Sequence, residues 1–585
     1  MKTLIVLALC LAGNTLFAQD MSFSKPGKNI YQELPDPEKT PVEEWAKVTN
    51  DIQVSFVSSN LSYPKSQPPL ITETTTWQCK AWKGEKVHTQ LLLWTKTDIE
   101  VLSLSVSDLV DNIGNRIKAE VIKTGFVRYV ITDKYKGGCD QRLSMKVDSS
   151  LVADPIDIVA TIPVRANTVQ PIWISIKVTN SIPSGKYSGI IVVNSLEKDT
   201  LSISVDVVSQ TLPPANEWSF DLDLWQHPVA VARVHNVPLW SDRHFDLMRP
   251  YYELLASAGK KSITTILIDE PWGHQTYDDF PGLIKWVKRK DNSWSYDYSL
   301  FDKYVSFVMS CGITKRINCY TMVPWNLNFQ YFDEALGMDT VFHSTVGSEA
   351  YNRFWTTMLT DFTGHLKEKG WFDISAIAMD ERPMEAMKSV ISLLRKVDPR
   401  WEIALAGDEF QSEIEGDIYD YSIAISKSGI DENIISKRKA QGKPITFYTC
   451  CADEYPNNFT FSPPAENVFI GWYAAAKGYS GFLKWAYNSW PKDPIMDSRF
   501  TRFPGGDTYL VYPGPRSCVR FEKMIEGIQD FEKISILRNQ FVKEGDINRN
   551  QELDEILDYI KKENLADIPA DEIIDQVKAR LMNIY

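Results

Sequence analysis

The sequence predicts an N-terminal antiparallel β-sandwich, then a (β/α)₈ barrel and a short helical tail. Three observations predict this fold class. The chain has 585 residues, too many for one ordinary domain. Residues 51–210 consist of short alternating segments with no convincing long helix. Beyond them, strand and helix patterns alternate eight times. We therefore place the sandwich at 51–213, the barrel at 214–541 and the tail at 542–585.

Period-two alternation and β-branched residues mark the sandwich strands, and Gly, Pro, Asn and Asp separate them. The expected strands are Ile52–Val57, His88–Trp94, Glu100–Val106, Lys118–Ile122, Phe126–Ile131, Pro171–Val178, Ile190–Val193 and Leu201–Val208. A Pro-rich linker at 211–215 then ends this part.

Eight short apolar segments follow, each compatible with a buried parallel strand. They are Ser219–Leu224, Ser262–Ile268, Arg316–Met322, Ser375–Met379, Glu402–Ala406, Tyr419–Ile425, Ile445–Cys450 and Gly481–Trp485. Segments with helical periodicity separate them, and Cys518–Phe541 follows the last. In the tail, Leu553–Ile560 and Ile573–Met582 are amphipathic.

The N-terminus has the pattern of a signal peptide. A lysine precedes an apolar run from Leu4 to Ala12, and Leu-Phe-Ala ends at Ala18. We expect cleavage there, a lead-in segment over 19–50, and a periplasmic or extracellular protein. No other apolar run reaches the ~18 residues of a membrane span.

Composition excludes some function classes. The net charge of -13 and the pI of about 5.2 argue against a nucleic-acid partner. The 18 Trp and 25 Tyr suit a glycan partner, although large β-rich proteins also bury aromatics. Histidine pairs and CxxC spacings typical of metal sites are missing from the sequence, so we expect no metal and no cofactor.

Cysteine usage indicates no disulfide framework. Seven cysteines remain after signal cleavage, an odd number in a large protein. A Cys79–Cys139 bridge is one possibility, and we expect Cys450 and Cys451 to line a strand.

The ends of the predicted barrel strands concentrate aromatic and acidic residues. Active sites of such barrels lie at the C-terminal strand ends. The candidate substrate contacts there are Trp225, His227, Tyr320, Trp325, Trp485, Tyr487, Asn488 and Trp490, joined by Asp507 and Tyr509 from a Gly-rich loop. Each also has a plainer interpretation, as a core residue, a gate, a satisfied rim histidine or a loop that shapes the mouth.

Two carboxylate pairs compete for the chemistry, Asp269-Glu270 after the second strand and Asp380-Glu381 after the fourth. Glycoside hydrolysis usually needs two carboxylates on opposite sides of the scissile bond. Neighbours on one strand can hardly flank a bond. They suffice when a 2-acetamido group of the substrate attacks the anomeric carbon, one carboxylate holds the acetamide N–H and the other protonates the leaving oxygen. That acid needs a raised pKa.

An acidic pair before proline also has a structural interpretation. Acids favour a helix N-terminus, and proline suits the first turn. The aromatic strand ends favour the chemical interpretation for Asp380 and Glu381.

Three segments together resemble the catalytic domain of glycoside hydrolase family 123. They are Ala378–Pro383 (Ala-Met-Asp-Glu-Arg-Pro), the Gly-rich segment Phe503–Gly514, and Arg516–Glu532, which carries Glu-Gly-x-x-Asp-Phe. The resemblance covers about 214–540. It implies a β-N-acetylgalactosaminidase with an N-terminal sandwich and a barrel, with Glu381 as acid/base and Asp380 orienting the acetamido group.

One position departs from the expected pattern. Arg382 stands between the pair and Pro383, where a plain Asp-Glu-Pro would be expected. Paired with a carboxylate it would lower that group's pKa, so we expect it to point outward. In the last segment, Arg520, Glu522, Glu526 and Asp530 recur at helical spacing, and we expect most of them to tie the last helix to the barrel.

We therefore expect an exo-acting hydrolase that removes terminal β-linked N-acetylgalactosamine from a glycan or glycoconjugate. Two rivals remain. One is a glycosidase for another hexose, with Asp269 or Glu270 acting opposite Glu381. The other is a glycan-binding protein without catalysis, in which Glu381 would be dispensable.

Overall fold

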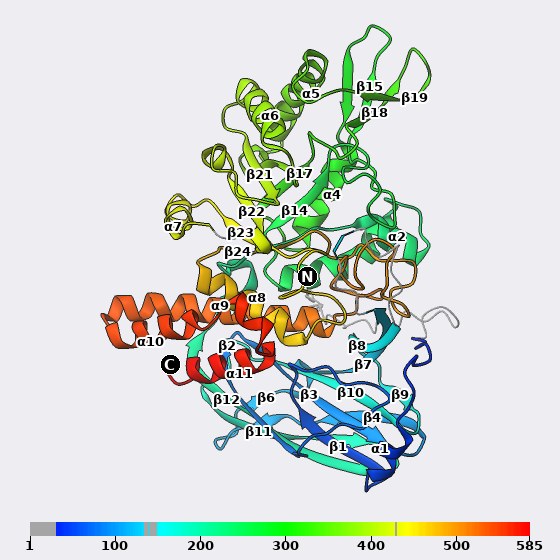
Figure 1. The fold of residues 1–585 in the computed structure, drawn as a ribbon, viewed down its shortest axis with the longest axis vertical. Helices are drawn as coiled ribbons and strands as arrows, with labels where there is room; N and C mark the ends of the chain where they lie inside the picture. Colours follow the sequence, from blue (N-terminus) through cyan, green and yellow to red (C-terminus); the bar gives the residue numbers. More distant parts are fainter. Residues whose placement is uncertain (1–30, 134–137, 140–148, 428–429) are drawn as a thin grey trace, which may run out of the picture. The chain divides into compact units, whose positions relative to one another are not determined.

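The computed structural model describes residues 31–133, 138–139, 149–427 and 430–585 (Figure 1). The expected signal peptide lies outside the described residues. Residues 33–585 form one compact unit. Both predicted parts are present, an N-terminal pair of β-sheets and a parallel eight-stranded barrel with helices.

The first part is a sandwich of two sheets. One has the strand order β1-β3-β10-β7-β8, and the other β2-β12-β11-β4-β9, with β5 and β6 beside it. Pairing is antiparallel except between β2 and β12. The bounds are β1 Ile52–Val57, β2 Thr76–Lys83, β3 Lys86–Thr95, β4 Ile99–Val106, β5 Leu109–Val110, β6 Arg116–Ile117, β7 Ile122–Asp133, β8 Ser149–Asp157, β9 Thr161–Val164, β10 Thr168–Lys177, β11 Gly185–Asn194 and β12 Lys198–Thr211.

Inward-facing aliphatic residues of both sheets form the sandwich core, among them Leu91, Leu93, Ile174 and Val205. The predicted strand Lys118–Ile122 is wrong, because Ala119–Val121 form a short 3₁₀ helix that leads into β7. Strands β2, β8 and β9 escaped prediction, since polar residues and prolines interrupt their patterns. The predicted lead-in contains helix α1 (Val42–Lys47), whose buried Trp45 donates to the Ser66 carbonyl at 2.8 Å.

The barrel strands match the eight predicted segments to within a few residues. They are β13 Asp221–Leu224, β14 Ser262–Ile266, β17 Arg316–Tyr320, β20 Ser375–Met379, β21 Glu402–Gly407, β22 Asp420–Ala424, β23 Ile445–Tyr448 and β24 Gly481–Lys484. Their order is β13-β24-β23-β22-β21-β20-β17-β14, all parallel. A bridge between Leu222 and Lys260 brings the first and second strands together.

Helices separate the strands as predicted, except between β21 and β22, where the described chain forms only the 3₁₀ helix Glu415–Asp417. They are α2 Pro228–His235, α3 Asp242–Ser257, α4 Ser299–Ser310, α5 Glu349–Glu368, α6 Met384–Val397, α7 Glu432–Ala440, α8 Pro464–Lys477 and α9 Val519–Glu544. The tail contains α10 (Ile547–Asp558) and α11 (Ala570–Leu581). Among the described residues, none of the helices combines the length and the apolar surface needed to cross a bilayer.

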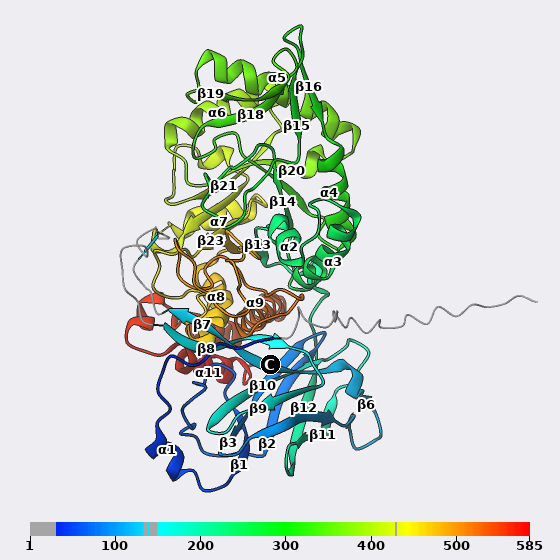
Figure 2. The ribbon, with the colours of Figure 1, turned by 90° about the vertical axis from the view of Figure 1, so that its right-hand side faces the viewer.

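A second sheet of four strands belongs to the barrel part, in the order β16-β15-β18-β19 (Figure 2). Strands β15 (Lys285–Lys288) and β16 (Trp294–Asp297) lie in the connection after β14, and β18 (Asn328–Asp333) and β19 (Met338–His343) in the connection after β17. Because both connections leave the C-terminal strand ends, this sheet belongs to the side of the barrel where the site is expected.

The disulfide differs from the expected one. Cys139 pairs with Cys451, with the two Cα atoms 5.1 Å apart, and Cys79 has a free thiol. Cys450 and Cys451 lie in the turn after β23 and not in a strand. The bridge therefore links the sandwich part of the chain to the C-terminal end of the seventh barrel strand, a pairing over 312 residues.

Candidate active site

The upper interior of the barrel is packed asymmetrically. Strands β20, β21 and β22 contribute buried alanines, namely Ala376, Ala378, Ala404, Ala406 and Ala424. Large rings from the ends of β13, β14 and β17 occupy the opposite side, and they include Trp225 and Tyr320. Small residues on one wall make room for bulky rings on the other, which fits the close packing of protein interiors.

Asp380 and Glu381 follow β20 directly and precede α6, at the C-terminal end of the fourth strand. Asp380 is buried, whereas Glu381 reaches the surface. The buried strand fixes the backbone of the pair, so that two adjacent carboxylates meet different surroundings.

Asp380 is held by two donors. Trp325 Nε1 donates to its Oδ2 at 2.6 Å, and Arg382 Nε donates to its Oδ1 at 3.0 Å. The Arg382 guanidinium lies 4.2 Å from the centroid of the Trp325 ring. The expectation that Arg382 points outward is therefore wrong, because it is buried and bonds Asp380. Burial raises the pKa of Asp380, and it outweighs the Arg382 charge and the two donated bonds, which lower this pKa and favour the carboxylate.

Glu381 has a different partner, the hydroxyl of Tyr448, which donates to its Oε1 at 2.7 Å. Desolvation by neighbouring protein atoms raises the pKa of Glu381, although part of the residue is exposed. The hydrogen bond from Tyr448 lowers this pKa, and the charges of Asp380 and Asp408 raise it. The net direction is upward, as a general acid requires.

An aromatic wall adjoins the pair. Trp225 stacks on Trp272 at 5.3 Å and meets Tyr320 at 4.5 Å between centroids. Phe280 continues the wall, 4.9 Å from Trp272 and 4.1 Å from the His227 ring. The five rings are only 2–6% exposed, so the wall is closely packed inside the barrel in this structure.

Several polar atoms of this wall have no protein partner. Among the described residues, Nε1 of Trp225, Nε1 of Trp272 and both ring nitrogens of His227 are buried and unpaired. Burial lowers the pKa of His227 to about 3, so its ring is neutral near pH 7. Buried polar atoms normally have partners, so these four are unsatisfied polar atoms of the wall among the described residues.

The rival pair, Asp269 and Glu270, braces a loop. Asp269 accepts a hydrogen bond from the Gly282 amide at 2.6 Å. Glu270 accepts from the amides of His274, at 3.1 Å, and of Phe280. Both carboxylates thus hold the connection that carries Phe280 into the wall.

Five of the candidate contacts are fully buried, namely Tyr487, Asn488, Trp490, Asp507 and Tyr509. The Asn488 side chain accepts a hydrogen bond from the His227 backbone N–H at 2.9 Å and donates one to the His227 carbonyl at 3.0 Å. Asp507 pairs with Lys484 at 2.6 Å and accepts from Trp485 Nε1 at 3.3 Å. These five side chains are enclosed by protein in this structure, whereas Trp485 is partly exposed.

Tyr487 and Trp490 show that an aromatic residue near a strand end can bond to other parts of the protein, so its position alone does not identify a substrate contact. The Tyr487 hydroxyl donates to the Tyr251 carbonyl at 3.0 Å, and Trp490 Nε1 donates to the Val511 carbonyl at 2.7 Å. Tyr509 packs against Tyr512 at 5.2 Å. These residues fill the layer between the Gly-rich loop and helix α3.

Three residues of the site were not predicted as contacts, namely Tyr448, Trp272 and Phe280. Tyr448 and Trp272 do lie at strand ends, which is the signal that could have singled them out. Phe280 lies ten residues beyond Glu270 in a loop, and only the folded loop brings it to His227.

The predicted ties of α9 also have different partners. Arg520 bonds Asp154 of β8 at 2.9 Å, and Glu522 pairs with Lys86 of β3 at 2.5 Å. His88 of β3 pairs with Glu526 at 2.6 Å. Arg520 also donates to the Asn458 carbonyl at 2.6 Å, and Asp530 accepts from Trp472 Nε1 at 3.0 Å, so these residues join α9 both to the barrel, as expected, and to the sandwich.

A parallel barrel with an anchored carboxylate, a neighbouring carboxyl of raised pKa and an aromatic wall is the arrangement of a glycoside hydrolase. Comparison with known families agrees. Residues 225–537 match the model described as "Glycoside hydrolase 123, catalytic domain", and residues 56–195 match the N-terminal domain of the same family. The chain therefore belongs to glycoside hydrolase family 123.

Solved structures give the same assignment. A family 123 glycoside hydrolase from Clostridium perfringens, described in terms of glycolipid glycan hydrolysis, is 27% identical. The match covers 91% of this chain and 98% of that one, with a TM-score of 0.82. A family 39 hydrolase from Bacteroides cellulosilyticus WH2 is 11% identical over 73% and 82% of the two chains, with a TM-score of 0.33, and adds nothing to the assignment. No curated protein matches the chain.

Proposed function

We propose that this glycoside hydrolase removes terminal β-linked N-acetylgalactosamine from glycans by substrate-assisted, retaining catalysis. The 2-acetamido oxygen attacks the anomeric carbon and forms an oxazolinium-like intermediate while the glycosidic bond breaks. Glu381 gives its proton to the leaving oxygen and then takes one from the attacking water. Asp380 accepts the acetamide N–H and stabilises the intermediate's positive charge.

The observation that carries this proposal is that two adjacent carboxyl groups have different hydrogen-bond donors. Trp325 and Arg382 both donate to Asp380, which favours its ionised form. The pKa of both carboxyl groups is raised, but among the described residues Glu381 has only one neutral donor and no bond from a cation, which leaves it better suited to carry a proton. Two carboxyl groups in one site with such unlike surroundings are a basis for assigning base and acid roles.

The substrate class and location are part of the same proposal. The Clostridium perfringens relative is described as acting on glycolipid glycans, and we propose a similar oligosaccharide substrate here. We also propose that the N-terminal segment directs export, so that the enzyme meets glycans outside the cytoplasm.

The rival use of Asp269 or Glu270 opposite Glu381 is less well supported. Backbone amides already engage both carboxylates. Under the rival scheme Glu270→Gln would be as damaging as Asp380→Asn. Under ours it alters the loop and leaves the chemistry in place.

The test is hydrolysis of nitrophenyl β-N-acetylgalactosaminide beside the β-N-acetylglucosaminide and the β-galactoside. We expect release from the first, and none from the β-galactoside, because it lacks the acetamido nucleophile. Cleavage of the β-galactoside at a comparable rate would overturn substrate assistance. Cleavage of the glucosaminide alone would overturn the sugar assignment.

A second prediction concerns pH. Tyr448→Phe removes a hydrogen bond that stabilises the Glu381 carboxylate, so the pKa of Glu381 rises. Because the protonated form is required, the high-pH limb of kcat/KM moves to higher pH, by up to about one unit. Tyr296→Phe is the control, since its buried hydroxyl has no partner among the described residues. A limb that stays in place or moves down would contradict the assigned acid.

A further inference from the structure

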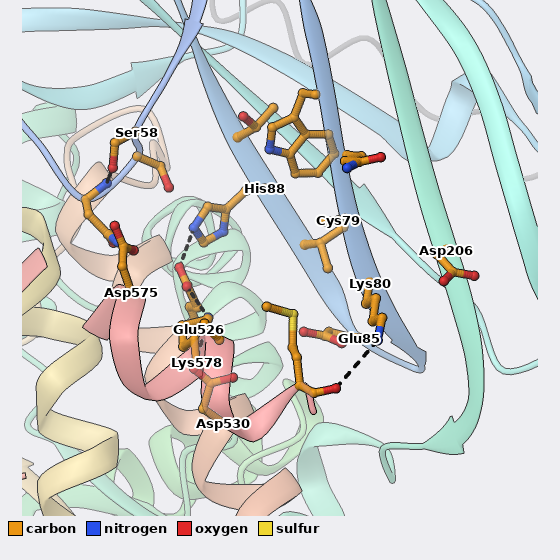
Figure 3. A pocket seen from close by; sticks show the side chains of 18 of the residues that line it. Ser58, Cys79, Lys80, Glu85, His88, Asp206, Glu526, Asp530, Asp575 and Lys578 are labelled. Atoms are coloured by element: carbon orange, nitrogen blue, oxygen red, sulfur yellow. Dashed lines mark hydrogen bonds and ion pairs between the residues drawn. The ribbon is translucent and has the colours of Figure 1, made fainter. Parts of the chain in front are cut away.

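A cavity of about 1000 Å³ lies outside the candidate active site (Figure 3). Its walls come from β1 and β3 of one sheet, β2 and β12 of the other, and helices α9 and α11. Its lining residues include neither Asp380 nor Glu381 nor any of the candidate substrate contacts. Small-molecule sites usually have roughly 300–1,000 Å³, so this one has room for several sugar rings.

The charges of the cavity neutralise one another. Its lining includes six lysines and five carboxylates, and Lys86 pairs with the carboxylate of Glu522. At the inner end, Glu526 accepts from Lys523 and Lys578, and Asp530 lies 3.0 Å from Lys578 Nζ. An ionic ligand would have to break such buried pairs at a high cost. A neutral ligand avoids that cost.

One buried acceptor in this cavity has no donor. Asn60 is 6% exposed, and its Nδ2 donates to Asp575 Oδ1 at 2.7 Å. Its Oδ1 has no partner among the described residues. An unsatisfied buried acceptor costs about 1–3 kcal/mol, and a ligand hydroxyl or amide hydrogen would satisfy it.

The opposite side supplies a ring and free polar groups. Trp77 of β2 packs against the sandwich core, where it stacks on Phe56 at 6.5 Å, and part of the residue stays exposed. Gln78, Ser204 and Asp206 line the same cavity, and no side-chain hydrogen bond to another described residue is formed by any of the three. In Figure 3, Asp206 lies on one side of Cys79, and Asp575 and Ser58 lie on the other.

We propose that this cavity is a second saccharide-binding site, which holds a neutral oligosaccharide while the barrel acts on another glycan terminus. A partly exposed indole, polar side chains, an unpaired amide oxygen and balanced charge together suit a neutral sugar. The inference rests on the chain being a glycoside hydrolase and not on which sugar it releases. Binding at two sites raises the effective concentration of termini on a glycan-rich surface.

Calorimetric titration of the Glu381→Gln protein with a soluble tetrasaccharide, N-acetylgalactosamine β-linked to a galactose-extended lactose, tests the proposal. We expect two binding events. Adding Trp77→Ala removes one of them or weakens it at least tenfold, whereas adding Trp371→Ala, a partly exposed tryptophan outside both sites, changes neither. A single event, or two events unaffected by Trp77→Ala, would overturn the second site.

A second variant distinguishes a loss of glycan binding from a loss of folding. Gln78→Ala with Asp206→Ala changes side chains that are not buried, so the sandwich should keep its stability. In otherwise wild-type enzyme this variant should hydrolyse the small nitrophenyl substrate with kcat and KM within twofold, yet show a raised KM on glycan-coated beads. Unchanged KM on the beads would contradict the proposal. Two binding events with no hydrolysis of the small substrate would reject the proposed sugar and leave the second site standing.

Discussion

The Glu381→Gln protein should lose about 10²–10⁴-fold in kcat on a substrate whose leaving group needs a proton, such as the β-N-acetylgalactosaminide of an alcohol or another sugar. Gln keeps the size of the side chain and can still accept from the Tyr448 hydroxyl, but it has no proton to give. On the 2,4-dinitrophenyl glycoside the loss should be far smaller, because that leaving group departs without protonation. Steady-state kinetics on both substrates measure the difference.

Two comparisons sharpen the assignment of Glu381. Asp380→Asn should reduce hydrolysis of both substrates to a similar degree, since Asp380 acts on the nucleophile and not on the leaving group. Glu409→Gln changes an exposed carboxylate at the end of β21 and should have little effect on either. Equal losses on the two substrates for Glu381→Gln would show that Glu381 is not the proton donor.

The Lys484→Met protein should be less stable by about 3–5 kcal/mol, the usual cost of removing one partner of a buried pair. Both side chains of the Lys484–Asp507 pair are 0% exposed, and the lysine also donates to the Thr449 carbonyl at 3.2 Å. Methionine fills a similar volume but leaves the Asp507 carboxylate without its cation. Urea unfolding followed by tryptophan fluorescence measures the loss.

The double variant Lys484→Met/Asp507→Leu should recover most of that stability, because no uncompensated charge remains. Lys477→Met, an exposed lysine on α8, is the matched control and should unfold with the wild type. If Lys484→Met unfolds at the same urea concentration as the wild type, the pair is not a determinant of stability, and Asp507 has another function.

Local pattern was enough to predict the barrel strands and the position of Asp380 and Glu381. Each barrel strand is a short apolar run bounded by turn residues, and the pair follows one such run directly. The rest of the site depends on contacts between distant segments. Tyr448 meets Glu381 over 67 residues, and Trp325 meets Asp380 over 55. No local periodicity encodes such pairs.

Burial of polar residues was the other feature that the sequence could not predict. Asp507 and Asn488 have the residue types of sugar ligands, and they lie in the expected region, yet each is used inside the protein. Whether a carboxylate faces a cavity or a buried lysine depends on the register of the whole loop. The same limit explains Arg382, whose partner is only two residues away but whose orientation depends on the Trp325 ring.

The charged residues of α9 have an evolutionary consequence. Arg520 depends on Asp154, and Lys533 on Glu85, and all four side chains are buried. A barrel transferred by recombination onto an unrelated N-terminal module would keep Arg520 and Lys533 on α9 without these two carboxylate partners. We therefore expect the two parts of this chain to be inherited together, because either part alone would leave buried charges without their partners.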